Sequence, residues 1–224
     1  IFAINPRAVL FSYNPRHMRR FLYCDHKEER AVTELVLVRH GATELNLSGR
    51  YCGRLDPPLA EPGRAAVRKT ARQLAGFLPE RVYCSPALRA KETAAIIAPD
   101  VPAVELPALR EMDFGAFEGL VADEIERRMP EVWQAYMTDW LHFTFPQGDS
   151  VQEYLAGAAN IIRAIIDEAL DGGVLIVSHK GFIMAALSAL LHGDSTHLFC
   201  YDIRPAGFAR LTAAGGFPVL TQLI

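Results

Sequence analysis

Two short apolar runs, Leu35–Val38 and Val174–Val177, constrain the fold of this chain more than any other feature. Both are drawn from leucine, isoleucine and valine, which is typical of a strand buried on both faces in a parallel sheet. The first run leads into Arg39-His40-Gly41 and the second into Ser178-His179-Lys180-Gly181. Open α/β sheets bind their ligands beyond the carboxyl ends of the strands, so we expect both histidines at one edge of the sheet.

The rest of the chain alternates between expected helices and strands. Apolar residues at helical spacing predict a helix that begins at Pro62 and further helices over 86–98 and 150–170. The segment 182–191 is apolar on nearly every side, which predicts a buried helix. Short apolar segments predict strands at 81–84, 106–112, 208–212 and 219–223. Ser85 is expected to cap the helix that Pro86 begins, and residues 44–61 are expected to form a loop. The pattern predicts a three-layer α/β fold, with a mostly parallel central sheet and helices on both faces.

Length and composition narrow the class of protein. The 224 residues suffice for one large α/β domain or two small ones, and we expect one domain over 32–224 after an N-terminal extension, 1–31, of unknown role. The net charge of −3 gives no reason to expect nucleic acid or a membrane as a partner. The four cysteines are too scattered for a zinc site or a disulfide framework, which favours a reducing, cytoplasmic location. No apolar run reaches the ~18 residues that a membrane span needs.

Residues 120–149 are polar and carry several aromatic side chains, among them Trp133, Tyr136, Trp140 and Phe143. We interpret this region as a small helical cap over the site. An ordinary helical insertion with a few core aromatics is the alternative.

Five side chains at expected strand ends combine into a chemically coherent set. His40 and His179 follow the two buried runs, Arg39 precedes the first histidine, Arg89 lies one helical turn after another strand, and Glu111 ends a fourth. Two arginines bind a dianion, an imidazole attacks phosphorus, and a carboxylic acid protonates the leaving oxygen. Read alone, the Arg39-His40-Gly41 triplet fits a surface histidine equally well.

The loop 44–61 adds further candidates for the pocket. Arg50, Tyr51 and Arg54 lie within it, and Arg54 is better explained as a solvated side chain. No residue is expected to ligate a metal, and no cofactor is expected.

Four ordered motifs resemble those of the histidine phosphatase superfamily, also called the phosphoglycerate mutase-like family. They are LVRHGATELN at 37–46, YCSPALRAKETA at 83–94, LREMDFGAFEG at 109–119 and VSHKG at 177–181. The resemblance covers about residues 34–222 and implies the corresponding three-layer fold. Three positions depart from the family pattern without removing a catalytic group: Ala42, Ala60 at the start of a helix, and Lys180.

The resemblance implies a role for each matching residue. His40 is the expected nucleophile and forms a phosphohistidine; Arg39, Arg89, His179 and Asn46 are expected to bind the phosphoryl group. Glu111 falls at the proton-donor position, with Asp113 and Glu118 as rival acids. A nucleophilic His40 must be neutral, so its other ring nitrogen is expected to donate to a backbone carbonyl. Lys180 is expected to add charge near the pocket and to influence the choice of substrate.

Within the superfamily, the chain is similar to the phosphatase branch, because it lacks room after Glu111 for the larger insertion of the mutases. The stretch YMTDWLHFTFPQGDS at 136–150 is similar to alpha-ribazole phosphatases of cobalamin assembly. The expected partner is therefore a small phosphorylated metabolite, with alpha-ribazole 5′-phosphate as one example. A phosphoglycerate mutase and a catalytically silent binding protein are the alternatives, and a homodimer is left open.

Overall fold

The computed structural model describes residues 33–224 except 169–171, 195–196 and 215–216. The expected N-terminal extension, 1–31, lies outside the described residues, so its boundary and its role remain predictions.

The strands of the described part form one mixed sheet in the order β3-β2-β4-β1-β5-β6. Their bounds are β1 Thr33–Arg39, β2 Pro79–Cys84, β3 Ala103–Glu105, β4 Gly173–Ser178, β5 Phe208–Ala214 and β6 Phe217–Leu223. The pairs β3–β2, β2–β4 and β4–β1 are parallel, whereas β5 runs antiparallel to β1 and β6 antiparallel to β5. The carboxyl ends of β1 and β4 therefore lie side by side, as expected.

The side chains of β1 alternate between two hydrophobic clusters. Leu35 and Leu37 belong to the cluster under one helical layer, and Val36 and Val38 belong to the cluster under the other. All four side chains are at most 3% exposed, so β1 is buried on both faces. The sheet is therefore covered on both sides, which confirms the predicted three-layer α/β class.

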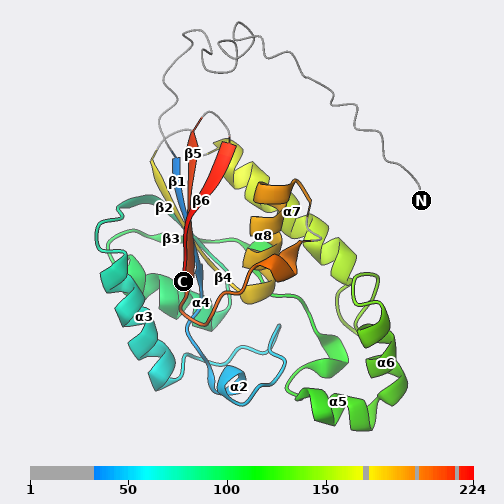
Figure 1. The fold of residues 1–224 in the computed structure, drawn as a ribbon. Coiled ribbons are helices and arrows are strands. Elements are labelled where there is room, and N and C mark those ends of the chain that lie inside the picture. Colours follow the sequence, from blue (N-terminus) through cyan, green and yellow to red (C-terminus); the bar gives the residue numbers. More distant parts are fainter. Residues whose placement is uncertain (1–32, 169–171, 195–196, 215–216) are drawn as a thin grey trace, which may run out of the picture. The chain divides into compact units, whose positions relative to one another are not determined.

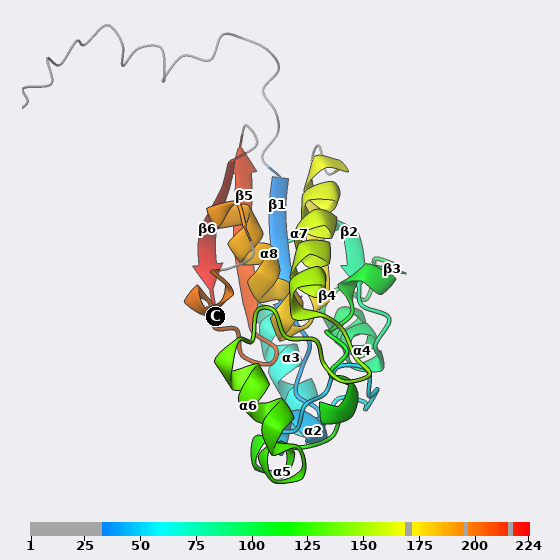
Figure 2. The same ribbon diagram turned by 90° about the vertical axis from the view of Figure 1, so that its right-hand side faces the viewer.

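Helices occupy both faces of the sheet (Figures 1 and 2). Their bounds are α2 Glu44–Leu47, α3 Glu61–Gln73, α4 Leu88–Ile97, α5 Ala122–Arg128, α6 Pro130–Thr138, α7 Val151–Glu168 and α8 Lys180–His192. Helices α3 and α4 cover one face, and α7 and α8 cover the other. The short 3-10 helices are η1 Pro107–Leu109, η2 Gly115–Phe117 and η3 Leu198–Cys200.

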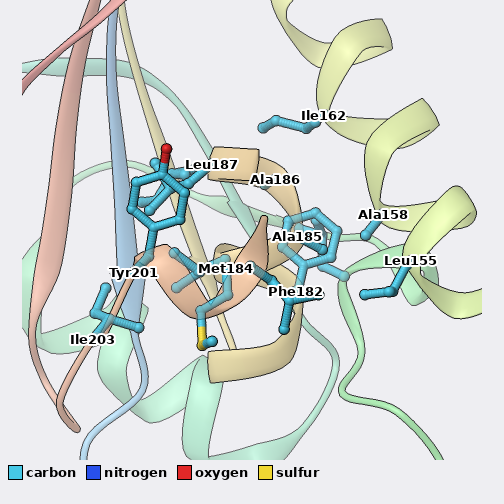
Figure 3. Close-up of a cluster of buried hydrophobic side chains, with 14 of the residues drawn as sticks. Leu155, Ala158, Ile162, Phe182, Met184, Ala185, Ala186, Leu187, Tyr201 and Ile203 are labelled. Carbon is cyan, nitrogen blue, oxygen red and sulfur yellow. The ribbon is translucent and has the colours of Figure 1, made fainter. Parts of the chain in front are cut away.

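Helix α8 is buried over most of its length, as its apolar sequence predicts. Phe182, Met184 and Leu187 are at most 5% exposed and pack together with Leu155 and Ile162 of α7 (Figure 3). This packing fixes the first turn of α8, which begins directly after His179.

The predicted cap region contains the expected short helices, α5 and α6. Around Phe117, which is completely buried, the rings of Tyr136, Phe143 and Phe145 lie with centroids 5.3–6.1 Å away. These aromatic side chains extend the hydrophobic cluster under α7 and α8 into the cap region.

Three local predictions were wrong. Helix α4 begins at Leu88 with Ala87 at its N-cap, so Ser85 does not cap it. The predicted strand 106–112 lies instead at Ala103–Glu105, because Pro107 has no N–H for a sheet ladder and begins η1. The predicted loop contains the one-turn helix α2, which Thr43 and Asn46 stabilise by capping each other's backbone N–H.

Ala60 stands at the N-cap of α3, as expected, and its side chain caps nothing. Within the described residues, no helix combines the length and apolar character that crossing a membrane requires.

Candidate active site

The two strand-end histidines meet at the carboxyl edge of the sheet. His40 follows β1, His179 follows β4, and the centroids of their rings are 5.0 Å apart. Both side chains are buried, with exposed fractions of 3% and 0%. The structure thus brings together two imidazoles from segments far apart in the sequence.

The hydrogen bond of His40 fixes which ring nitrogen is free. Nδ1 lies 2.7 Å from the carbonyl oxygen of Gly41, which can only accept, so Nδ1 carries the proton. Burial lowers the pKa of His40 well below its usual 6.5, and the nearby positive charge of Arg89 lowers it further. The ring is therefore neutral at physiological pH, and Nε2 keeps its lone pair, as a nucleophile requires.

His179 is held in one tautomer by two neighbours. Arg89 Nη2 donates to its Nδ1 at 3.3 Å, so Nε2 carries the proton and donates to Ser85 Oγ at 2.8 Å. Burial lowers the pKa of His179 well below 6.5, and His40 and Arg89 reinforce the effect. The sequence did not identify Ser85 as part of the site. Its buried hydroxyl is explained by this bond.

Arg89 lies completely buried inside a cage of backbone carbonyls. Its Nη1 donates to the oxygen of Leu55 at 2.7 Å, and its Nη2 donates to Gly53 at 2.9 Å and to Cys52 at 3.4 Å. The carboxylate of Asp56, about half exposed, is 3.9 Å from Nη1. The guanidinium is thus fixed in place by the loop between α2 and α3 before any ligand arrives.

Two arginine nitrogens at this edge have no protein acceptor. Arg39 Nη1 donates to the carbonyl of Ile203 at 2.8 Å, but Nε of Arg39 and Nε of Arg89 are buried without a hydrogen-bond partner. Among the described side chains, the only other such nitrogen is Nε of Arg210, on β5. Buried N–H donors are nearly always paired in native proteins, so the two orphan donors indicate a site for an anion.

Glu118 anchors the loop that forms the cage. Its carboxylate accepts the backbone N–H groups of Gly53 at 2.9 Å, Arg54 at 2.8 Å and Leu55 at 3.3 Å, and that of Phe114 at 3.3 Å. Because it accepts four backbone N–H groups, the Glu118 carboxylate has a structural role. This use argues against Glu118 as the proton donor.

Glu111 is held between helices α7 and α8. Its Oε1 accepts from Met112 N at 3.1 Å and lies 3.0 Å from the hydroxyl of Tyr154, whose oxygen is also 3.1 Å from the carbonyl of Arg110. Its Oε2 accepts from Gly181 N at 3.2 Å. Glu111 is 8% exposed. Sequence reasoning missed Tyr154, which reads as one more residue of the apolar face of α7.

Asp113, the other rival acid, forms an ion pair with Arg54. Asp113 Oδ2 is 3.5 Å from Arg54 Nε, and Asp113 Oδ1 accepts from Gly115 N at 2.9 Å. Arg54 also contacts Asp149 at 3.3 Å. This surface ion pair matches the expectation that Arg54 is not a pocket residue.

The remaining predicted binding residues have local roles as well. Asn46 Oδ1 accepts from Thr43, so its amide Nδ2 is the atom available as a donor. Tyr51 packs edge-on against Phe114 at 5.2 Å and against Phe117 at 5.7 Å, so its ring belongs to the aromatic cluster around Phe117. Burial raises the pKa of its hydroxyl. Lys180 Nζ forms an ion pair with Asp202 at 2.8 Å.

Taken together, the geometry suits transfer of a phosphoryl group. A neutral imidazole, two guanidinium groups whose buried Nε–H donors are unused, and a buried carboxyl lie around one sheet edge. Within the described residues, no three His, Cys, Asp or Glu side chains are grouped closely enough to hold a metal ion.

Comparison with known proteins gives the context of this site. Residues 35–224 match the sequence model described as Histidine phosphatase superfamily (branch 1). An adenosylcobalamin/alpha-ribazole phosphatase of Salmonella typhimurium is 31% identical over 192 residues, 84% of this chain and 95% of that protein. A 2,3-bisphosphoglycerate-dependent phosphoglycerate mutase of Bradyrhizobium diazoefficiens is 29% identical over 197 residues, 84% of this chain and 91% of that protein.

A longer relative and a solved structure extend the comparison. A 6-phosphofructo-2-kinase/fructose-2,6-bisphosphatase of Caenorhabditis elegans is 31% identical over 215 residues, which are 93% of this chain but 42% of that protein. The crystal structure of a putative alpha-ribazole-5′-P phosphatase from Escherichia coli superimposes with a TM-score of 0.81 at 25% identity. It covers 85% of this chain and 95% of that one.

Proposed function

Because the chain belongs to the histidine phosphatase superfamily and is a phosphoric monoester hydrolase, we propose that it works without a metal, through a phosphohistidine on His40. The observation that carries this proposal is the neutral His40 beside two arginines whose buried Nε–H groups lack acceptors. The substrate would be a small phosphorylated metabolite.

In the first step, Nε2 of His40 attacks phosphorus and the bond from phosphorus to the ester oxygen breaks. Glu111 gives its proton to that oxygen, and the alcohol leaves. In the second step, the Glu111 carboxylate takes a proton from water, the water oxygen bonds to phosphorus, and the P–N bond breaks. Its electron pair returns to Nε2, and inorganic phosphate is released.

The arginines supply the charge that phosphoryl transfer requires. Arg39 and Arg89 would hold the phosphoryl oxygens, and their positive charge does at those oxygens what a metal ion does in many other phosphoryl-transfer enzymes. Asn46 Nδ2 and the Nε2–H of His179 would be further donors. For His179 this requires that a phosphoryl oxygen replace Ser85 Oγ as the acceptor.

Alpha-ribazole 5′-phosphate is the substrate that we propose first. The name of the Salmonella relative and the segment 136–150 support it. The Bradyrhizobium relative supports the alternative, mutase-type phosphoryl transfer. A homodimer, a cytoplasmic location, and the absence of nucleic-acid and membrane partners belong to the same proposal and rest on the sequence alone.

The test is release of inorganic phosphate in EDTA, first from p-nitrophenyl phosphate and then from a panel that contains alpha-ribazole 5′-phosphate. His40→Ala should abolish turnover, whereas His142→Ala, at an exposed histidine paired with Asp139, should not change it. Quenching during turnover should trap acid-labile, base-stable phosphate on the protein.

Each alternative has its own signature in these assays. Isomerisation of phosphoglycerate that outpaces phosphate release in the presence of a bisphosphorylated activator would favour a mutase. Wild-type protein that releases no phosphate from any ester would favour a silent binding protein. His40→Ala with wild-type activity would refute the nucleophile.

A further inference from the structure

A cavity of about 220 Å³ borders the catalytic carboxyl. Glu111, Lys180 and Gly181 form one part of its wall. The rest is apolar or aromatic, and includes Phe114, Tyr136, Trp140, Leu155, Met184 and Phe199.

The walls of this cavity come from the cap and from the helical layer together. Tyr136 lies on α6, Leu155 on α7, Met184 on α8 and Phe199 on η3; Figure 3 shows Leu155 and Met184 on their helices. Trp140, just after α6, meets Phe199 edge to face with ring centroids 4.9 Å apart. The cavity therefore lies where the cap region meets helices α7 and α8, beside Glu111.

Phe199 is unusually exposed for a large aromatic side chain. It is 70% exposed, although Leu198 beside it is buried. The contact with Trp140 leaves the rest of the Phe199 ring uncovered, so a ligand in the cavity would have an aromatic surface to pack against.

The cavity offers little for an anionic ligand. Among its lining residues only Glu111 and Lys180 carry a charge, and Lys180 Nζ already pairs with Asp202 at 2.8 Å. A carboxylate group placed among the aromatic walls would lose its hydration without gaining a partner.

We propose that this cavity binds the leaving group of the phosphomonoester, and that this group carries an aromatic or other apolar ring. The inference rests on the proposed function. Glu111 must reach the oxygen that joins phosphorus to the leaving group, so the carbon atoms attached to that oxygen lie next to Glu111, where the cavity begins. The site thus selects esters with an apolar alcohol over esters of small alcohols that carry a carboxylate.

The experiment compares 3-phenylpropyl phosphate with propyl phosphate, whose leaving oxygens are chemically alike. Burying a phenyl ring should raise kcat/KM by about 10- to 100-fold over propyl phosphate. O-phosphoserine should be a poorer substrate than propyl phosphate. Equal kcat/KM values for the phenylpropyl and propyl esters would overturn the inference.

Substitutions locate the selectivity in the cavity. Trp140→Ala and Phe199→Ala should each lower the ratio of the two kcat/KM values by about 5-fold or more, since each removes an aromatic wall. Met137→Ala is the matched control, because Met137 lies on α6 and is 60% exposed but does not line the cavity. If both Trp140→Ala and Phe199→Ala kept the wild-type ratio of the two kcat/KM values, the phenyl ring would bind elsewhere and the inference would be refuted.

Binding of unreactive phosphonates separates this inference from the proposed function. Calorimetry should show that 3-phenylpropylphosphonate binds wild-type protein more tightly than propylphosphonate, and that Trp140→Ala reduces the difference. This result without turnover of any ester would refute the phosphatase mechanism and support the cavity. If both esters were turned over but the two phosphonates bound with equal affinity, the phosphatase mechanism would be supported and the role of the cavity refuted.

Discussion

Replacing Glu118 by glutamine tests whether this carboxylate anchors the arginine cage or serves as the acid. Both oxygens accept backbone N–H groups: Oε1 from Gly53, Arg54 and Phe114, and Oε2 from Gly53 and Leu55. Glutamine has the same shape, but it must present its own NH₂ group to some of these donors. The loop 52–55 would then lose charge-assisted hydrogen bonds and gain a clash between donors.

The expected magnitude follows from these bonds. Hydrogen bonds to a charged group contribute about 1.5–3 kcal/mol each. In Glu118→Gln the backbone N–H groups that face the amide oxygen keep part of this contribution. We therefore expect Glu118→Gln to lower the free energy of unfolding by about 2–4 kcal/mol. For a domain of this size that corresponds to a Tm about 4–16 °C lower.

The same change should weaken the binding of phosphate. The carbonyls of Gly53 and Leu55 hold Arg89, so a displaced loop releases the guanidinium from its position. The inhibition constant of inorganic phosphate should rise about 10-fold or more, because an anion contact that was fixed in advance has to be ordered on binding.

Urea unfolding and phosphate inhibition measure the two effects. Glu61→Gln is the matched control, because Glu61 is exposed and forms a surface ion pair with Arg68, so the stability of this variant should change by less than about 0.5 kcal/mol. If Glu118→Gln kept its stability and phosphate affinity but lost kcat and the basic limb of its pH profile, Glu118 would be the acid, and the assignment of Glu111 would be wrong.

Three further predictions concern the same edge. Burial lowers the pKa values of His40 and His179, so below pH 6.5 the unfolded chain takes up protons that the folded protein does not. The free energy of unfolding should fall by up to about 1.4 kcal/mol per histidine for each pH unit below 6.5, and a flat urea-unfolding profile from pH 6.5 to 5.5 would contradict this. In Gly181→Ala the new Cβ would lie 2.5 Å from Glu111 Oε1, so the Glu111 carboxyl must move. The kcat for an alkyl phosphate should therefore drop about 10-fold. The kcat for p-nitrophenyl phosphate should drop much less, because its leaving group needs no acid. Tyr154→Phe removes the hydroxyl beside Glu111 and should cost about 1–3 kcal/mol of stability and lower kcat, with the phosphate inhibition constant unchanged; a wild-type kcat would contradict a positioning role.

The strand-end histidines were predictable because a buried strand has a strong local signature. Leu35–Val38 and Val174–Val177 identify the strands, and the geometry of a parallel sheet then brings His40 and His179 together. Arg89 was predictable as an early residue of a helix, even though α4 begins two residues after the expected start.

The surroundings of these residues were not predictable from the sequence. The cage around Arg89 consists of backbone carbonyls, which every residue possesses, so nothing in the letters distinguishes positions 52, 53 and 55. Three of the four backbone partners of Glu118 lie 63–65 residues away, and only the folded chain decides that it contacts them. Pro107 shows a different limit, because the strand and the 3-10 turn after it lie within one apolar segment.

The place of β1 in the sheet also bears on how the protein is made. Leu35 is among the first described residues, yet its neighbours in the sheet are Val174 of β4 and Leu211 of β5. During translation the strand that carries Arg39 and His40 emerges from the ribosome long before either neighbour, with both edges open. Such distant pairing makes folding slow, and the exposed edges can pair with other nascent chains. The edge that carries His40 can therefore form only after β4 and β5 have been made, and chaperones that shield β1 until then should raise the yield of active protein.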